Sequence, residues 1–190
     1  SIYGASSDSK LDSALLTFYN KKPIDRIFEN HQKPNVLFII LEGFSADAIS
    51  AFGGLKGYTP YLDSVLESSI IWTNFYANGD RTYKGLPAIL NGWPTRPVGS
   101  ITQDADHTGH LPSIAKILKS NGYSTSFYYG GESEFANIKS YLLNTAFNQI
   151  MDINDFSKAL RGKKWGVADH YVFERLARDL NETKKPFFNT

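Results

Sequence analysis

The stretch "NVLFIIL", residues 35–41, continues after Asn35 as an uninterrupted apolar run that is rich in β-branched side chains. Such a run is typical of a strand that is buried on both faces of a parallel sheet. After it, segments with the pattern of helices alternate with segments with the pattern of strands as far as residue 190. This alternation predicts an α/β fold in which a mostly parallel sheet is sandwiched between helices.

The individual elements follow from local patterns. Thr59 and Pro60 form a helix-start signal. Pro87 would clash with a carbonyl of the preceding turn, so the regular helix around it is expected to begin a few residues after Thr82. The predicted helices are 60–66, 86–93, 111–118, 134–145 and 169–180, and the predicted strands are 70–77 ("IIWTNFYA"), 123–129 ("YSTSFYY"), 149–153 ("QIMDI") and 185–190 ("KPFFNT").

Composition excludes several classes of function. Twenty Lys and Arg residues stand against 19 Asp and Glu, and the resulting net charge of +1 offers no basic field to a nucleic acid. Because the chain has no cysteine, it forms no disulfide, thiolate metal site or thiol nucleophile. The longest apolar run, residues 36–41, is too short to span a bilayer. Residues 1–34 are polar and weakly patterned, which indicates a tether with one short helix at 11–19.

Two polar residues follow predicted strands, where sites gather in open α/β sheets. Glu42 comes directly after the first strand, and Thr82 lies near the start of the helix after the second. A helix N-terminus favours phosphate oxygens or a developing alkoxide, and Arg81 and Lys84 strengthen its positive potential. A threonine hydroxyl needs such a setting, a base or a metal to act as a nucleophile. The structural alternative is a solvated loop glutamate and a threonine that only caps a helix.

Five ordered blocks stand out between about Lys33 and the last residue: "KPNVLFIILEGFSADAISAFGG", "TPYLDSV", "FYANGDRTYKGLPAILNGWP", "STSFYYGGESEFANIKSYL" and "WGVADHYVFERL". Together they resemble successive blocks of a known family, the lipoteichoic acid synthase type of phosphoglycerol transferases. These enzymes belong to the alkaline phosphatase and sulfatase superfamily.

The resemblance implies a domain organisation and a metal site. Residues 33–190 would be the N-terminal part of a sulfatase-like catalytic domain, and residues 1–32 a tether after an upstream membrane anchor, which places the protein outside the cytoplasm. Glu42 and Thr82 match two ligands of one divalent metal, usually Mn²⁺, with Zn²⁺ or Mg²⁺ as alternatives. The family completes the site with an Asp-His pair far downstream. Asp169 and His170 do not match it, because their segment reads as a helix N-terminus with Asp169 as its cap.

The resemblance also suggests residues for substrate binding. Glu132 and Asn137 lie in a block that contributes to the glycerophosphate pocket of the resembling enzymes, and Trp165 could pack against a substrate. Arg81 or Lys84 could assist at the transferring phosphate. The alternative is that Glu132 and Asn137 are surface residues and that Trp165 is a buried anchor.

The reaction implied is a two-step phosphoryl transfer. Thr82 would attack the phosphodiester of a phospholipid such as phosphatidylglycerol, release diacylglycerol and hold glycerophosphate until a glycan or polymer hydroxyl accepts it. Sulfate ester hydrolysis is not expected, because the Cys/Ser-x-Pro-x-Arg pattern of sulfatases is replaced by Thr82 followed by Tyr-Lys-Gly. The alternatives are a phosphoethanolamine transferase, a phosphodiesterase that uses water as acceptor, and a catalytically silent, lipid-sensing ectodomain.

Overall fold

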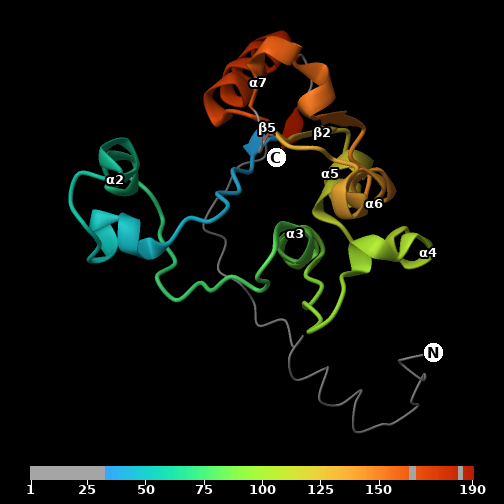
Figure 1. The fold of residues 1–190 in the computed structure, drawn as a ribbon, viewed down its shortest axis with the longest axis horizontal. Helices are drawn as coiled ribbons and strands as arrows, with labels where there is room; N and C mark the ends of the chain where they lie inside the picture. The colour runs from blue at the N-terminus through green and yellow to red at the C-terminus, as the bar shows by residue number, and fades with distance from the viewer. Residues whose placement is uncertain (1–32, 163–165, 184–185) are drawn as a thin grey trace, which may run out of the picture. The chain divides into compact units, whose positions relative to one another are not determined.

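The computed structural model describes residues 33–162, 166–183 and 186–190. It divides the chain into the units Ser1–Lys33 and Pro34–Thr190, and the expected tether 1–32 with its helix at 11–19 lies outside the described residues. The second unit, drawn as a ribbon in Figure 1, contains a four-stranded sheet. The strand order is β1-β6-β2-β3, and every neighbouring pair is parallel. The strands are β1 (Val36–Leu37), β2 (Ser124–Tyr128), β3 (Gln149–Met151) and β6 (Phe187–Asn189). The predicted α/β class with a mostly parallel sheet is confirmed.

The remaining described elements are helices, a second small sheet and short turns. The helices are α2 (Pro60–Leu66), α3 (Thr82–Asn91), α4 (Ala105–Thr108), α5 (Ile114–Ser120), α6 (Ile138–Asn144) and α7 (Asp169–Glu182). A second sheet pairs β4 (Arg161–Gly162) with β5 (Gly166–Val167) in antiparallel fashion. Short 3₁₀ turns occur at η1 (Ala46–Ala48), η2 (Ser50–Phe52), η3 (Ile101–Gln103), η4 (Phe135–Asn137), η5 (Ile153–Asp155) and η6 (Lys158–Leu160). Among the described helices, none is both long and apolar enough to cross a membrane.

Several predicted elements have different bounds in the structure. The helix predicted at 111–118 begins at Ile114, because the Ser113 hydroxyl accepts from the Ala115 N–H and caps it. The helix predicted at 134–145 is broken, since Ala136 and Asn137 adopt left-handed backbone conformations and α6 starts only after them. The helix α3 begins at Thr82 rather than after it, with Pro87 inside.

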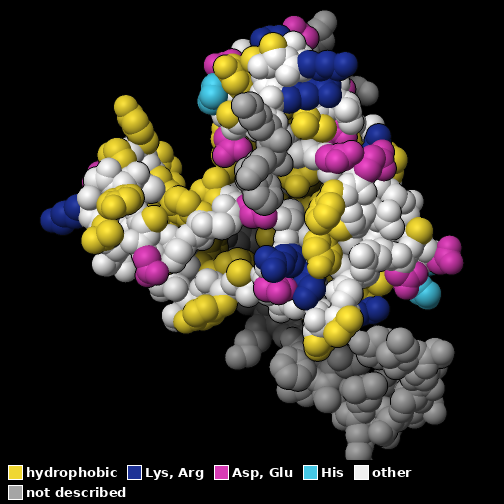
Figure 2. Space-filling model, in the orientation of Figure 1, with side chains coloured by type: hydrophobic (Ala, Val, Ile, Leu, Met, Phe, Trp, Pro, Cys, Tyr) yellow, Lys and Arg dark blue, Asp and Glu magenta, His cyan; other side chains and the backbone are white. Residues whose placement is uncertain are grey.

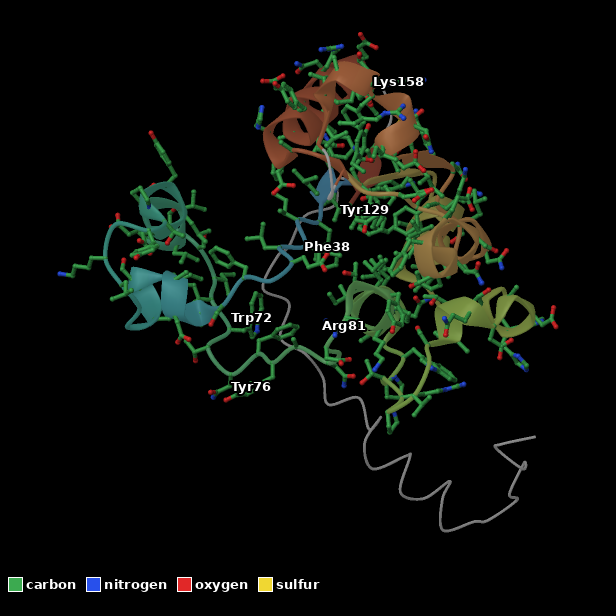
Figure 3. The ribbon with its side chains drawn as sticks, in the orientation of Figure 1. Phe38, Trp72, Tyr76, Arg81, Tyr129 and Lys158 are labelled. Carbon is green, nitrogen blue, oxygen red and sulfur yellow. The ribbon has the colours of Figure 1, made fainter. Side chains whose placement is uncertain are left out.

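Two strand predictions are corrected by the structure. Residues 70–77 form no strand, and Trp72 and Tyr76 are 66% and 81% exposed (Figure 3). Only Val36 and Leu37 of the run 35–41 have strand geometry, and Ile39 is 54% exposed rather than buried on both faces. A strand ladder needs a hydrogen-bonded neighbour, and among the described residues β1 pairs with β6 alone. Figure 2 shows that hydrophobic side chains are also exposed over α2.

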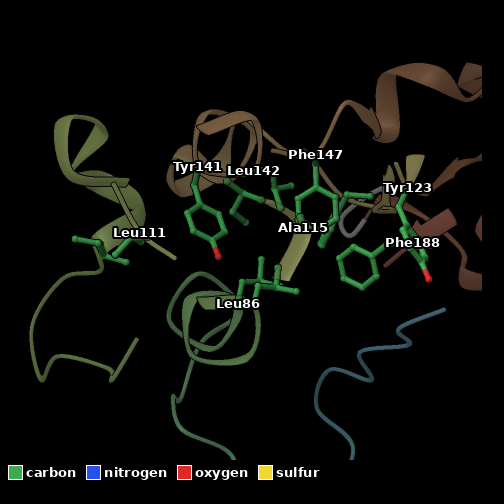
Figure 4. Packing of buried hydrophobic residues seen from close by; sticks show 12 residues of the cluster. Leu86, Leu111, Ala115, Tyr123, Tyr141, Leu142, Phe147 and Phe188 are labelled. Carbon is green, nitrogen blue, oxygen red and sulfur yellow. The ribbon is translucent and has the colours of Figure 1, made fainter. Parts of the chain in front are cut away.

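The core lies between the sheet and helices α3, α5 and α6 (Figure 4). Phe147 is its centre, with its ring centroid 5.5 Å from that of Phe127 and 5.7 Å from that of Phe188. Phe188 belongs to β6 and is fully buried, so the late segment "PFF" fills the space between β1 and β2. On the other side of β2, Tyr128 donates a hydrogen bond to Asp179 of α7, with the two oxygens 2.9 Å apart.

Replacing Phe188 with Ala is expected to destabilise the protein by about 3–5 kcal/mol, because it leaves a cavity at the centre of the sheet. Phe75→Ala is the matched control, since Phe75 is 81% exposed and its loss should change the free energy of unfolding by less than about 0.5 kcal/mol. Urea unfolding followed by circular dichroism measures both changes. Equal effects of the two variants would contradict the described core.

Tyr128 is expected to make stability fall at alkaline pH. Burial of its side chain, followed by the hydrogen bond to Asp179 and the charge of that residue, raises the pKa of Tyr128 well above its ordinary value. The folded protein therefore keeps this proton where the unfolded chain loses it, so the free energy of unfolding should decrease as pH rises above about 10. Tyr128→Phe should make this decrease less steep in urea unfolding from about pH 8 to pH 11. The exposed control Tyr76→Phe should leave it unchanged, and an equally steep decrease in Tyr128→Phe would refute the assignment.

Candidate active site

The candidate site is formed by two segments that lie 40 residues apart in the sequence. Thr82 is the first residue of α3, and its Oγ1 donates a hydrogen bond to Oε1 of Glu42. Glu42 follows β1 after a short exposed stretch, and Gly43 next to it has the positive φ that a turn requires. The structure thus brings together the two residues that sequence reasoning selected. The way Thr82 is positioned differs from the expectation, because residues 70–77, expected to form the strand before it, form none.

A folded-back loop fixes the approach to Thr82. Gly79 lies against the backbone of Gly85, and a Cβ on Gly79 would come within 3.0 Å of the Gly85 nitrogen. The Asn78 side chain accepts a hydrogen bond from the Thr95 N–H at 3.0 Å. The turn-forming "NGD", residues 78–80, therefore packs over the first turns of α3 and leads directly into the helix.

The two cations beside Thr82 have different surroundings. Arg81 is exposed at the N-cap position of α3 (Figure 3), as expected for a group that could meet a substrate. Lys84 pairs with Asp80 at 3.0 Å, and its side chain is only 12% exposed. The hydrogen bond from Lys84 lowers the pKa of the Asp80 carboxyl. Residues two apart on a helix point in nearly opposite directions, so Lys84 faces a recess beside Trp93 and Arg96 rather than the Thr82 hydroxyl.

Tyr129 is a site neighbour that sequence reasoning missed. It directly follows β2, and its side chain is partly buried. Burial first, and then the negative charge of Glu42, raise the pKa of Tyr129. Its ring lies against Gly131, where a Cβ would come within 2.7 Å of Cζ. The rule that sites lie beyond the carboxyl ends of strands could have identified this residue, because Tyr129 ends the run "STSFYY".

For Glu132 and Asn137, the described part of the chain shows no hydrogen bond or ion pair with Glu42 or Thr82. Glu132 and Asn137 are exposed in the loop between β2 and α6. That loop reaches α3 through Phe135, whose ring packs edge-on against Tyr83 with centroids 6.3 Å apart. Trp165 lies outside the described residues.

Asp169 and His170 do not complete the pair. Asp169 is the first residue of α7 and not its cap, which is Ala168, and both side chains of the Asp-His pair are exposed. Within residues 33–162, 166–183 and 186–190, no three acidic or histidine side chains form a group that could hold a metal ion. The Glu42 carboxylate and the Thr82 hydroxyl are oxygen donors of the kind that Mn²⁺ and Mg²⁺ prefer, so they fit part of such a site.

A parallel sheet with a hydroxyl and a carboxylate paired beyond one of its strands defines an α/β domain whose polar groups gather where such folds bind ligands. The comparison with protein families gives the particular assignment. The model of the sulfatase family matches residues 34–190, and the chain belongs to this family. This confirms the superfamily expected from the sequence blocks. Its members are enzymes, sulfatases and phosphotransferases, and they typically depend on divalent metals.

Curated relatives include two sulfatases of Bacteroides thetaiotaomicron. The chain is 28% identical to an N-acetylgalactosamine-6-O-sulfatase over 125 residues, which cover 59% of this chain and 23% of the relative. It is 26% identical to an N-acetylglucosamine-6-O-sulfatase over 98 residues, 52% of this chain and 18% of the relative. The chain therefore matches about a quarter or less of the length of these relatives.

Solved structures share the fold more extensively. A protein in the alkaline phosphatase superfamily from Vibrio parahaemolyticus superimposes with a TM-score of 0.76 at 29% identity, covering 85% of this chain and 40% of the other. The lipoteichoic acid synthase LtaP from Listeria monocytogenes gives a TM-score of 0.70 at 17% identity, covering 83% of this chain and 40% of that one. At this level of identity, the likeness to LtaP shows the fold alone.

Added Mn²⁺ is expected to bind weakly, with a Kd on the order of 1 mM, because the pair supplies two oxygens and tight sites use more. Since Mn²⁺ is paramagnetic, amide NMR signals should broaden most around residues 42 and 82. Glu42→Gln should abolish this selectivity, whereas the exposed control Glu174→Gln should preserve it. Broadening that is insensitive to Glu42→Gln would place the ion elsewhere.

Proposed function

We propose that the protein transfers a glycerophosphate group from a phospholipid such as phosphatidylglycerol to a hydroxyl of a glycan or polymer, through a phospho-threonine at Thr82. The observation that carries this proposal is the Thr82 hydroxyl, which lies at the N-terminus of α3 and donates a hydrogen bond to Glu42. The oxygen is held at a positive helix end, where a phosphate is favoured.

Each step can be assigned to groups of this chain. In the first step, Thr82 Oγ1 bonds to phosphorus and gives its proton to Glu42 Oε1, while the bond from phosphorus to the diacylglycerol oxygen breaks and that oxygen takes a proton from water. In the second step, the acceptor hydroxyl oxygen bonds to phosphorus and gives its proton back to water, while the bond to Thr82 breaks and Glu42 returns its proton to Oγ1. A divalent ion held by Glu42 and Thr82 would neutralise charge on the transferring phosphate. Mn²⁺ is the first candidate, and Zn²⁺ or Mg²⁺ are alternatives.

Residues for substrate contact are proposed from the exposure of their side chains, because only an exposed side chain can reach a substrate. Arg81 is the nearest exposed cation to Thr82 in the sequence and is the candidate for the phosphate oxygens. Glu132, Asn137 and Trp165 remain candidates for the glycerol or acceptor side, whereas Lys84 contributes mainly by holding Asp80. The phospholipid donor implies work at the outer face of a membrane, with an anchor upstream of this chain.

Sulfate ester hydrolysis, the activity named for the curated relatives, is the less favoured reaction. Thr82 occupies the nucleophile position, and "TYKG" does not have the Cys/Ser-x-Pro-x-Arg pattern that sulfatases use. The threonine hydroxyl serves phosphoryl transfer without modification.

Thr82→Ala is expected to lower the release of diacylglycerol from labelled phosphatidylglycerol vesicles, with Mn²⁺ present, by at least about 10³-fold. The fold should persist, because one hydroxyl at a helix start contributes on the order of 1 kcal/mol. Thr183→Ala is the matched control, since this exposed hydroxyl only bonds the Asp179 carbonyl at 2.8 Å.

Mass spectrometry of the quenched reaction should find glycerophosphate on Thr82. Turnover that survives Thr82→Ala would exclude Thr82 as the nucleophile. Release of free glycerophosphate without transfer to any glycan would indicate a phosphodiesterase, and lipid binding without turnover would indicate the silent ectodomain.

A further inference from the structure

The first turn of α3 contains a carbonyl that the helix itself cannot satisfy. In an α-helix, the N–H of residue i donates to the carbonyl of residue i−4, so the Tyr83 carbonyl would be paired with residue 87. Residue 87 is Pro87, which has no N–H and whose ring pushes against the carbonyl four residues earlier. The residue directly after Thr82 thus loses its helical partner.

Ser100 supplies the missing donor. Its Oγ donates to the Tyr83 carbonyl oxygen at 2.6 Å in a partly buried position. The Ser100 side chain is itself held, because it also caps the turn η3, accepting from the Thr102 N–H at 3.3 Å. Ile101 and Thr102 in that turn are only 2% and 1% exposed. The donor therefore projects from a firmly packed turn.

The rest of α3 is fixed by different contacts. Leu86 and Leu90 are buried in the core, and Asn91 at the last position donates to the Pro112 carbonyl at 2.6 Å and accepts from the Tyr141 hydroxyl. The first turn has no buried residue before Leu86. Its supports include backbone bonds to the Arg81 carbonyl, the packing of Gly79 against Gly85, the Lys84–Asp80 pair and the ring contact of Tyr83. Besides these supports, Ser100 is the residue that pairs the Tyr83 carbonyl.

We infer that Ser100 is a positioning residue for Thr82: its hydrogen bond to the Tyr83 carbonyl fixes the first turn of α3 and so holds Thr82 Oγ1 beside Glu42. This inference rests on the proposed function for its catalytic consequence. Misplacing a reacting oxygen by about 1 Å can cost on the order of 10²-fold in rate, so even partial fraying of this turn affects turnover.

Ser100→Ala is expected to lower kcat for diacylglycerol release on the order of tenfold and to leave KM nearly unchanged, because Ser100 touches the helix and not the substrate. Ser100→Thr keeps a hydroxyl and should restore most of the rate. Hydrogen exchange gives a readout that needs no substrate. The Lys84 and Gly85 amides, which donate to the Arg81 carbonyl at 3.0 and 2.9 Å, should exchange about tenfold faster in Ser100→Ala.

A second substitution tests the physical cause. Pro87→Ala restores a backbone N–H that can reach the Tyr83 carbonyl, so the effect of Ser100→Ala should be much smaller in the Pro87→Ala background than in the wild type. The control is Ser113→Ala, which removes a buried serine hydroxyl that donates to the Thr145 carbonyl at 2.9 Å. It should lower overall stability without selectively releasing the Lys84 and Gly85 amides.

The outcomes separate this inference from the proposed function. If Thr82→Ala keeps full activity, the nucleophile assignment fails, and the exchange experiment still decides whether Ser100 holds the turn. If Thr82 is essential but Ser100→Ala changes neither kcat nor exchange, the inference about Ser100 is overturned. The same holds if Pro87→Ala does not reduce the effect of Ser100→Ala.

Discussion

The described sheet depends on the insertion of β6 between β1 and β2. Val36 pairs with Phe188 on one side, and Thr125 pairs with Phe188 on the other, so one strand near residue 190 joins two strands from earlier in the chain. The Phe188 ring then packs against Phe147, which connects the sheet to the segment after α6. Without this strand, β1 would have no ladder among the described residues. The segment that carries Glu42 would then not be anchored to the sheet.

Two separate parts of the fold set the geometry of the site. Glu42 depends on the sheet through β1, whereas Thr82 depends on α3, which is packed against η3, α5 and the core. The hydrogen bond from Thr82 to Glu42 joins the segment after β1 to the start of α3. Pro87 inside the helix leaves the Tyr83 carbonyl without a helical donor, and Ser100 supplies one. Gly79 and Gly85 have no side chains, which permits the close approach of the loop to the helix. Irregular backbone near a site is retained where the surroundings determine it fully.

Local patterns were enough to predict much of this arrangement. The sequence predicts helix α7 because its 14 residues have one apolar face, a pattern that does not depend on contacts far away in the chain. Short runs of β-forming residues predict β2, β3 and β6 in the same way. The strand at 70–77 was not found in the structure, because pairing depends on a partner edge that local sequence does not encode. The carboxyl-edge rule selects Glu42, and the helix-start setting selects Thr82 although the strand expected before it is absent, but neither predicts the direction of Lys84 or the bond from Ser100 to Tyr83. Both depend on where a side chain points after the loop 92–100 has folded, and residue types do not specify that.

The central position of β6 has a consequence for the order of events during synthesis. About 150 residues separate β1 from its only described partner strand, as the hydrogen bond from the Phe187 N–H to the Asn35 side chain, 152 residues apart, illustrates. At roughly 5–20 residues per second, the ribosome needs on the order of ten seconds to deliver β6 after β1 has emerged. During that time the apolar run 35–41 has no strand to pair with, and chains with such distant contacts fold slowly and expose surfaces that aggregate. A nascent chain of this protein should therefore be a client for chaperones that shield extended apolar segments.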